Sequence, residues 1–283
     1  MDANELLAQV EEAMAGGRQF PEYEEVDAGR FVGNDMNRKP MGVMRAVAVN
    51  LASKLASGDA EVQVQFLVEY MQRIKADLLL ASETHLYAGR EAAMAWVVST
   101  FARLGYGCRC TLPKQRNSGV MIVWRQEGIS AAHFREGPEG RALFATLVTN
   151  AGEGKCRGLR VGAVYGVAGG DMHTMSEEKR KTELRLNQFV SQEVEQAVDS
   201  NLIPLVGGDL NSVDNPAADS RGTGAVHRSA SLVSSLLSTG MIDTFRVMHP
   251  TMCAVSRCTS GRDGNRIDAI MVWPSEEAEC VAA

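Results

Sequence analysis

Six polar side chains each stand at the end of an apolar run: Asn50, Glu83, Tyr165, Asp209, Asn211 and Asp268. Side chains at the ends of neighbouring buried strands meet at one rim of a sheet. Hard divalent cations such as Mg²⁺ take oxygen ligands and keep several waters, so one or two carboxylates suffice to hold them. The amides would then orient a phosphate or a water, and the tyrosine hydroxyl would donate to a phosphate oxygen. The pattern indicates metal-assisted chemistry on a phosphate group.

Each of these residues also has a simpler interpretation. Asp and Asn at a strand end often cap a helix or form a turn, and Asn50 considered alone fits that description. The segment Gly207-Gly208-Asp209-Leu210-Asn211 is more informative, because paired glycines after an apolar strand let the backbone and a substrate approach closely. The hypothesis of a site therefore depends on the whole set of residues.

Apolar periodicity predicts strands and helices that alternate in groups. Strands are predicted at 43–49, 78–81, 107–111, 119–124, 141–149, 158–164, 202–206, 254–259 and 266–272. Helices are predicted at 3–15, 62–74, 89–103, 177–198 and 229–238. Helix 89–103 is expected to point Ala92, Trp96 and Val97 inward. Helix 62–74 is expected to bury one stripe, Val62, Phe66, Tyr70 and Ile74. Groups of strands with helices between them favour sheets covered by helices.

Composition and charge limit the functions that the chain can have. Of its 283 residues 45% are hydrophobic and 23% are charged, which is typical of a globular protein with a sizeable core. The net charge of −6 argues against a basic, non-specific nucleic-acid binder. Residues 1–40 hold nine acids against four bases, so the remainder is close to neutral and a nucleic-acid groove is not excluded. We interpret 1–40 as an acidic, largely irregular leader and 41–283 as one domain.

The sequence also indicates a cellular location. No stretch approaches the roughly 18 apolar residues that span a bilayer, and the acidic start is unlike a secretory signal. The six cysteines form no CxxC pair, so we expect reduced thiols rather than a zinc site or disulfides. We expect an intracellular protein, nuclear or cytoplasmic, that is not secreted and has no membrane partner.

Six motifs, taken in sequence order, resemble the endonuclease/exonuclease/phosphatase superfamily. They are LLLASETHL (78–86), SGVMIVWR (118–125), VGAVYG (161–166), IPLVGGDLNSV (203–213), MIDTFRVMHP (241–250) and NRIDAIMV (265–272). The likeness covers residues 43–272 and is greatest to the endonucleases of LINE-type (non-LTR) retrotransposons, which resemble apurinic endonucleases and deoxyribonuclease I. The resemblance implies an α/β fold, a four-layered α/β sandwich of two face-to-face β-sheets flanked by helices.

The resemblance also implies a role for each matching residue. Glu83 looks like the ligand of Mg²⁺, or of Mn²⁺, and Asn50 like the amide that helps to position metal or phosphate. Tyr165 resembles the tyrosine that contacts the scissile phosphate. Asp209 looks like the residue that activates the attacking water, and Asn211 like its phosphate-orienting partner. Asp268 matches the catalytic acid of the RID motif. Arg221 and Ser256 match candidate substrate-binding residues.

The chain departs from the family pattern at its last motif. In the family the acid of RID pairs with a histidine from a Ser-Asp-His segment on the final strand, but no histidine follows His249 here. His85 and His249 belong to other motifs and are expected to pack or cap. Because only fifteen residues follow Asp268, we expect a domain that lacks its last strand. Such a chain would be a fragment of an active nuclease or a degenerate copy, with weak or no activity.

Three functions from different classes remain open. The leading hypothesis is Mg²⁺-dependent phosphodiester hydrolysis on nucleic acid, with DNA as the expected partner. The alternatives are a phosphatase or phosphodiesterase acting on a small phosphorylated substrate, and a catalytically inactive interaction module. Nucleic acid would be favoured if two basic clusters lined the rim that holds Glu83. The clusters are Lys179, Arg180, Lys181 and Arg185, and Arg103, Arg109, Lys114 and Arg116.

Overall fold

The computed structural model describes residues 39, 43–52, 55, 60–116, 118–149, 158–168, 175–213, 215–221, 231–250, 252, 256–260 and 263–274. Residues 1–38, with most of the predicted leader and its helix, lie outside this part of the chain. Lys39 is described, and its ammonium pairs with the buried carboxylate of Asp77. The boundary at residue 40 therefore stays a prediction.

The first half of the chain forms a four-stranded sheet of order β1-β2-β4-β3. The strands are β1 (Ala46–Asn50), β2 (Leu78–Ser82), β4 (Val120–Arg125) and β3 (Tyr106–Cys110). β1 and β2 are parallel, whereas β4 runs antiparallel to both β2 and β3. Every residue of β2 is buried, because both faces of this central strand are covered.

The second half forms a six-stranded sheet of order β10-β13-β8-β7-β6-β5. Its strands are β5 (Ile129–Glu136), β6 (Ala142–Thr149), β7 (Leu159–Val164), β8 (Ile203–Asp209), β10 (Ile242–Asp243) and β13 (Asp268–Val272). β7 and β8 are parallel and the other neighbours are antiparallel. A small sheet beside it joins β11 (Arg257–Ser260), β12 (Asp263–Asn265) and β9 (Ser220–Arg221).

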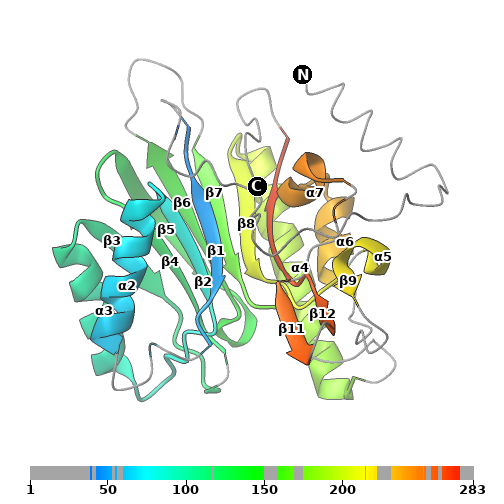
Figure 1. The fold of residues 1–283 in the computed structure, drawn as a ribbon, viewed down its shortest axis with the longest axis horizontal. Coiled ribbons are helices and arrows are strands. Elements are labelled where there is room, and N and C mark those ends of the chain that lie inside the picture. Colours follow the sequence, from blue (N-terminus) through cyan, green and yellow to red (C-terminus); the bar gives the residue numbers. More distant parts are fainter. Residues whose placement is uncertain are drawn as a thin grey trace.

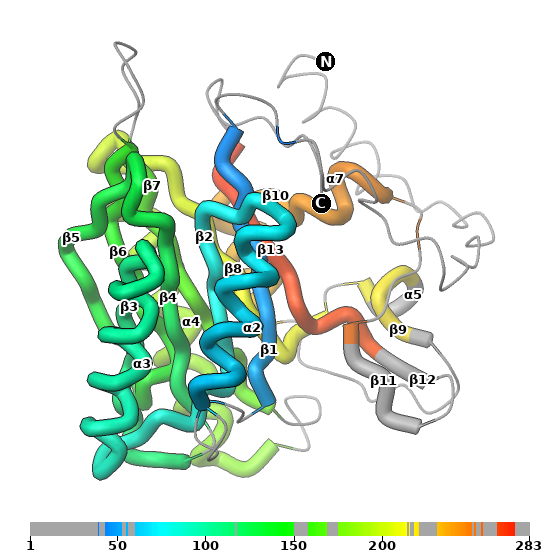
Figure 2. The backbone as a smooth tube through the Cα atoms, turned by 60° about the vertical axis from the view of Figure 1, so that its left-hand side comes forward, coloured from blue at the N-terminus to red at the C-terminus, as the bar shows by residue number. Residues whose placement is uncertain are grey.

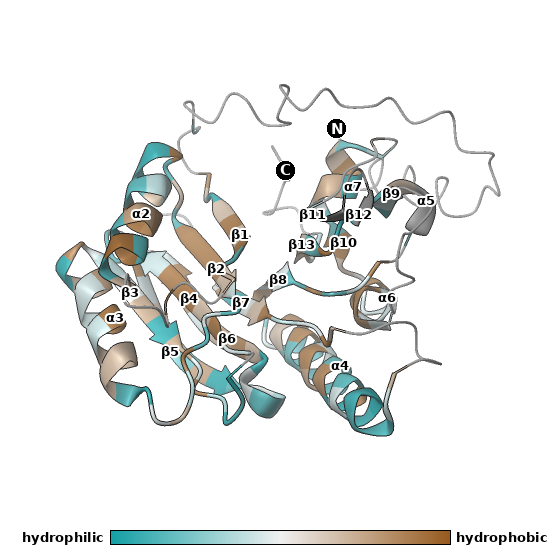
Figure 3. Ribbon diagram, turned by 60° about the horizontal axis from the view of Figure 1, so that its bottom comes forward, coloured by the Kyte–Doolittle hydropathy of each residue, from teal (hydrophilic) through white to brown (hydrophobic). Residues whose placement is uncertain are grey.

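Helices cover the outer face of each large sheet, as Figures 1 and 3 show. α2 (Ala60–Arg73) and α3 (Glu91–Arg103) lie on the four-stranded sheet, and α4 (Glu177–Asp199) and α6 (Ser231–Ser238) lie on the six-stranded sheet. The short helices are η2 (Pro138–Gly140), α5 (Pro216–Asp219) and α7 (Thr244–Met248). Among the described helices, none has the length and apolar character needed to cross a bilayer.

Three apolar cores separate the four layers. In β2, Leu79 and Ala81 belong to the core beneath α2 and α3, whereas Leu78 and Leu80 belong to the core between the sheets. A third core fills the space between the six-stranded sheet and the helices α4 and α6, where Phe144 packs with Val190. Two sheets face to face with helices outside form the predicted four-layered α/β sandwich, so the predicted fold is confirmed.

The structure corrects two predicted buried faces. On α2, Val62 and Phe66 are 60% and 58% exposed, whereas Tyr70 and Ile74 of the predicted stripe do pack into the core. The stripe that faces the sheet is the neighbouring one, Val64, Leu67, Val68 and Met71. Both stripes have helical spacing, and spacing alone does not say which one meets the sheet. On α3, Ala92 and Trp96 are exposed, whereas Val97 points into the core as predicted.

The periodicity also missed one long strand, β5. It is the edge strand of the six-stranded sheet and pairs with β6 alone. Only Ile129 of its eight residues is buried. A strand with so little apolar surface leaves no run of hydrophobic residues for a sequence pattern to detect.

Candidate active site

The candidate site residues gather where the rims of the two sheets adjoin. Asn50 ends β1 and Glu83 follows β2, its parallel neighbour. Tyr165 follows β7 and Asp209 ends β8, again a parallel pair. Asp268 begins β13 directly opposite Asp209. Because β1 packs against β8 and β13, which lie beside it in Figure 2, both sheets deliver side chains to one place.

The amide of Asn50 joins the two sheets at this place. Its Nδ2 donates to Glu83 Oε1 at 3.0 Å and to Asp209 Oδ2 at 2.8 Å. These two carboxylate oxygens therefore lie within about 6 Å of each other, since one nitrogen reaches both. The amide oxygen of Asn50 accepts from the backbone N–H of Ala52 at 2.8 Å, which fixes the orientation of the side chain.

Tyr165 is a further neighbour of Glu83, and the two side chains are hydrogen-bonded. Burial and the negative charge of Glu83 raise the pKa of the Tyr165 hydroxyl well above its usual value. The guanidinium of Arg141 lies 5.0 Å from the centre of the tyrosine ring and donates to the Gly166 carbonyl at 3.1 Å. Tyr165 is thus held in place and stays a hydrogen-bond donor at neutral pH.

Asp209 is a buried carboxyl with an altered acidity. Burial, together with the charges of Asp268 and Glu83, raises its pKa to about 7. The hydrogen bonds from the Asn211 backbone N–H, at 3.0 Å, and from Asn50 oppose this shift without cancelling it. A carboxyl with this pKa exchanges a proton with water near neutral pH, which is the property required of a general base.

Two site residues adopt a left-handed backbone conformation. Glu83 has φ 53° and Asn211 has φ 47°. Asn tolerates this region, whereas Glu rarely adopts it and is strained there by about 1 kcal/mol or more. The strain is held by a rigid loop, since Thr84 N–H donates to the Gly119 carbonyl and His85 N–H to that of Ser118, both at 3.2 Å.

Glycines at two positions allow β7 and β8 to converge at the site. A Cβ on Gly166 would lie 1.8 Å from the Leu210 carbonyl oxygen, and a Cβ on Gly208 would lie 2.2 Å from that of Val164. Gly208 also has φ +138°, outside the range that L side chains favour. The glycines of the VYG and GGD motifs are therefore required for the close approach of two backbones.

Ser256 acts on the site through the backbone. Its hydroxyl oxygen accepts from the N–H groups of Ile267 and Asp268 at 3.0 and 3.1 Å, which fixes the start of β13. Arg221 ends β9, where its backbone pairs with Gly264 of β12. The Arg221 side chain lies outside the described part of the structure, so its contact with substrate stays a prediction.

A buried ion-pair network that no sequence motif revealed stands next to the start of β13. The guanidinium of Arg266 bridges Asp219, at 2.6 Å, and Asp243, and Arg246 also pairs with Asp219. Phe245 lies beside both guanidiniums, 5.2 Å from each. Arg266 stands two residues before Asp268 in the RID motif, so this network positions the strand that carries the site carboxylate. The sequence features that could have revealed this network are the arginine of the RID motif and the acid of the Asp219-Ser220-Arg221 segment.

The donor set fits a hard divalent cation. Among the described residues no three His, Cys, Asp or Glu side chains cluster tightly enough to hold a metal by themselves. Mg²⁺ does not require such a cluster, because waters and phosphate oxygens complete its shell. Glu83 and Asp209 offer oxygens at the ends of β2 and β8. Burial, with the negative charges of Asp268 and Glu83, raises the pKa of Asp209, and a bound cation would favour its charged form.

The two basic clusters do not lie together on one rim. Lys179 belongs to the first turn of α4, and its ammonium donates to the Ala168 carbonyl just beyond Tyr165. The second cluster is divided by the fold. Arg116 lies against Tyr87 in the loop that follows Glu83, whereas Arg103 ends α3, which leads back to the start of β3 at the opposite end of the sheet.

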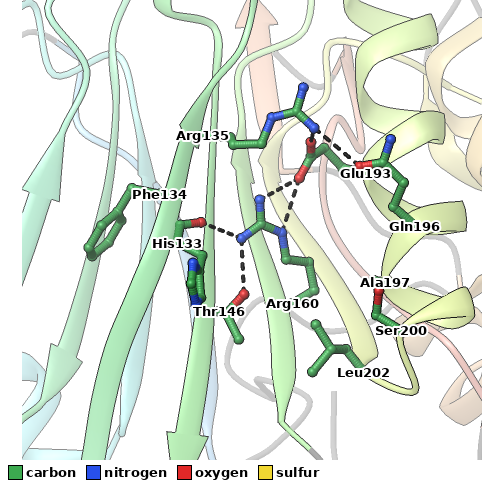
Figure 4. A pocket seen from close by; sticks show the side chains of 10 residues that line it. All are labelled: His133, Phe134, Arg135, Thr146, Arg160, Glu193, Gln196, Ala197, Ser200 and Leu202. Carbon is green, nitrogen blue, oxygen red and sulfur yellow. Dashed lines mark hydrogen bonds and ion pairs between the residues drawn. The ribbon is translucent and has the colours of Figure 1, made fainter.

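A pocket of about 360 Å³ lies at the other end of the six-stranded sheet (Figure 4). Arg160, near the start of β7, donates to Glu193 from Nε at 3.0 Å, and Arg135 lies 2.5 Å from the same carboxylate. Tyr165 follows the opposite end of β7. Since both arginines are engaged with Glu193, we attribute this network to the packing of α4 on the sheet.

Comparison with known proteins relates the fold to several enzymes. No protein-family model matches the chain, and no curated protein matches its sequence. The AP endonuclease LMAP from Leishmania major has a TM-score of 0.66 and 18% identity, over 96% of this chain and 91% of that one. An AP endonuclease from Archaeoglobus fulgidus has a TM-score of 0.63 and 18% identity, over 82% and 87%. The 3' phosphatase NExo from Neisseria, bound to a product DNA hairpin, has a TM-score of 0.63 and 19% identity, over 83% and 88%. The chain shares the fold of these proteins.

Proposed function

We propose that the chain is a metal-dependent phosphodiesterase acting on nucleic acid, of the endonuclease type found in non-LTR retrotransposons. One observation carries the proposal: Asn50 binds the carboxylates of Glu83 and Asp209 together at the junction of the two sheets. The similar fold of two AP endonucleases and of a phosphatase bound to DNA supports it. The retrotransposon type rests on the order of the ETHL, GDLN and RID motifs.

Each residue of the site has a task in this proposal. Glu83 would hold Mg²⁺, or Mn²⁺, and the cation would supply charge neutralisation at the phosphate and the leaving oxygen. Asn50 fixes the distance between Glu83 and Asp209. Asp209, with a pKa of about 7, takes a proton from the attacking water. Tyr165 donates its hydroxyl hydrogen to a phosphate oxygen.

The remaining residues orient these groups. Asn211 N–H binds Asp209 Oδ1, and its side-chain amide donates to the Gly166 carbonyl at 3.3 Å, between the two loops of the site. In this position it orients the phosphate. Burial and the charge of Asp268 raise the pKa of Asp209, which suits Asp209 to act as a base without help from the histidine of the family pattern. The proposed substrate is DNA, in the nucleus or cytoplasm.

Nicking of supercoiled plasmid in the presence of Mg²⁺ tests the proposal. We expect EDTA, Glu83→Gln and Asp209→Asn each to reduce nicking by at least about 100-fold, as for loss of a charge-stabilising group. Glu195→Gln, at an exposed position of α4, is the matched control and retains activity.

The outcome separates the three functions considered. Hydrolysis of p-nitrophenyl phosphate without nicking would indicate a phosphatase of small substrates. DNA binding without any hydrolysis would indicate an interaction module. Nicking that persists in Glu83→Gln would contradict the assignment of the metal to this residue.

A further inference from the structure

A cluster of one tyrosine and two arginines lies in and beside the loop that leaves the candidate site; we name it the Tyr87 platform. Tyr87 follows Glu83 by four residues and is partly exposed. The guanidinium carbons of Arg90 and Arg116 lie 5.6 and 5.2 Å from the centre of its ring. Arg90 Nε also donates to the Tyr87 hydroxyl at 3.4 Å. Both arginines are exposed, so the cluster faces solvent.

The platform is held rigidly relative to the site. Thr84 and Leu86, on either side of His85, are fully buried and anchor the loop in the fold. Beyond Tyr87, the Ala88 N–H donates to the Pro113 carbonyl at 2.9 Å, which ties the loop to the segment that carries Arg116. Four residues of chain span at most about 14 Å. The platform therefore lies within the reach of a nucleotide next to one bound at Glu83.

The platform and the site carry opposite charge. The hydrogen bond from Arg90, with the charges of Arg116 and Arg90, lowers the pKa of the Tyr87 hydroxyl below its usual value. At Tyr165 burial and the neighbouring carboxylates together raise the pKa of the hydroxyl. The guanidiniums of Arg90 and Arg116 thus make the platform positive, whereas the carboxylates of Glu83 and Asp209 make the site negative. A phosphate chain that meets a cation at Glu83 meets positive charge again at the platform.

We propose that the Tyr87 platform binds the nucleotide adjacent to the scissile phosphodiester, with its base stacked on the ring and its phosphate bound by the guanidiniums. This inference rests on the proposed function and specifies which kind of nucleic acid the site binds. Aromatic rings and guanidinium planes accept any base by its π-face, provided that the base is unstacked from its neighbours. The substrate class is therefore a strand with an unpaired nucleotide beside the cleavage point.

Fluorescence anisotropy of a short labelled DNA single strand, in EDTA so that no cleavage occurs, tests the platform. We expect Tyr87→Ala to weaken binding about tenfold without changing the salt dependence, as for loss of one stacked base. Arg116→Ala weakens binding and reduces the slope of log K against log salt by about 0.7, as for loss of one phosphate contact on a single strand. Tyr87→Phe keeps the ring and binds like the unchanged protein.

Arg73→Ala is the matched control. Its guanidinium lies 5.7 Å from the ring of Tyr70 in the same kind of pair, but on the last turn of α2, at the far end of the sheet from Glu83. We expect this variant to bind single strands with unchanged affinity. On a blunt duplex of the same sequence, whose bases are paired, Tyr87→Ala should have little effect.

The platform is refuted if Tyr87→Ala and Arg116→Ala bind as tightly as Arg73→Ala. Equal losses for Tyr87→Phe and Tyr87→Ala would exclude stacking, and equal losses of Tyr87→Ala on single strand and duplex would exclude the preference for an unpaired base. These measurements need no turnover. A chain that shows the expected binding but never nicks DNA would contradict the proposed hydrolysis. The proposed binding of a nucleotide by the Tyr87 platform would still be supported.

Discussion

Asp268 lies directly opposite Asp209 across the antiparallel pair of β13 and β8, so two carboxylates of one site face each other over a single ladder step. Burial and this like charge raise the pKa of Asp209 from 3.8, its value in an unfolded chain, to about 7. Between these values the folded protein binds a proton that the unfolded chain has released. The free energy of unfolding therefore falls as the pH rises from about 4 to 7.

The first prediction concerns this pH dependence in the metal-free protein. We expect Asp209 to contribute a loss of about 4 kcal/mol over that range, since its pKa is raised by about three units at 1.36 kcal/mol per unit. In Asp268→Asn the loss should be smaller by about 1 kcal/mol, because the like charge is gone. Urea unfolding in EDTA at successive pH values measures both. Asp199→Asn, at an exposed position that ends α4, is the control, and a profile for Asp268→Asn identical to this control would contradict the coupling.

A second prediction follows from the backbone of Glu83. Because its φ is 53°, replacement by glycine removes strain as well as a carboxylate from a crowded site. We expect Glu83→Gly to leave the free energy of unfolding unchanged or to raise it by about 1 kcal/mol, while nicking falls at least about 100-fold. Glu61→Gly, in the first turn of α2, should instead cost about 1 kcal/mol, since a helix penalises glycine. Equal destabilisation of the two variants would argue against strain at Glu83.

The third prediction concerns the close approach at Gly166. Gly166→Ala places a methyl group against the Leu210 carbonyl, and we expect a cost of about 3 kcal/mol or more, with loss of activity. Gly128→Ala is the comparison, because Gly128 has φ +83° but no atom near its missing Cβ. Its cost should be about 1 kcal/mol, from the backbone alone. Thermal and urea unfolding of both variants decide whether the contact or the backbone conformation dominates.

A fourth prediction concerns the buried network of Arg266. Arg266→Met leaves the carboxylates of Asp219 and Asp243 buried without this partner, and we expect a loss of about 3–5 kcal/mol. Arg266→Lys should recover less than half, because an ammonium cannot bond two carboxylates with the planar geometry of a guanidinium. Arg185→Met on the exposed side of α4 should cost less than about 0.5 kcal/mol. Full recovery by lysine would show that charge alone matters at this position.

Sequence patterns predicted the elements that are buried on both faces. The central strands β2 and β8 are continuous apolar runs, and such runs are visible without any structure. The edge strand β5 was missed because it has one buried residue, and the stripe of α2 was misplaced because Val62 and Phe66 have the same spacing as the residues that are buried. The exposure of a side chain depends on the layer that packs against its element, and the local sequence carries no information about that layer.

The same limit applies to the site. Asn50, Glu83 and Asp209 were found because each stands at the end of an apolar strand, where the fold brings rims together. Arg141 and Arg266 were not found, since their partners are distant in sequence and no spacing rule links an arginine to them. The left-handed backbone of Glu83 is likewise a product of the loop pairing with the segment before β4.

The division of the chain between the two sheets has a consequence for assembly. β1 to β4 lie before residue 126 and β5 to β13 lie after residue 128, joined only by an exposed connection at 126–128. Asn50 and Glu83 belong to the first segment, and Tyr165 and Asp209 to the second. Cleaved at Glu127, the chain would yield two fragments, neither of which holds a whole site. Recovery of nicking on mixing would then depend on the concentration of both fragments. The rate of nicking would be proportional to the number of fragment pairs that have assembled correctly.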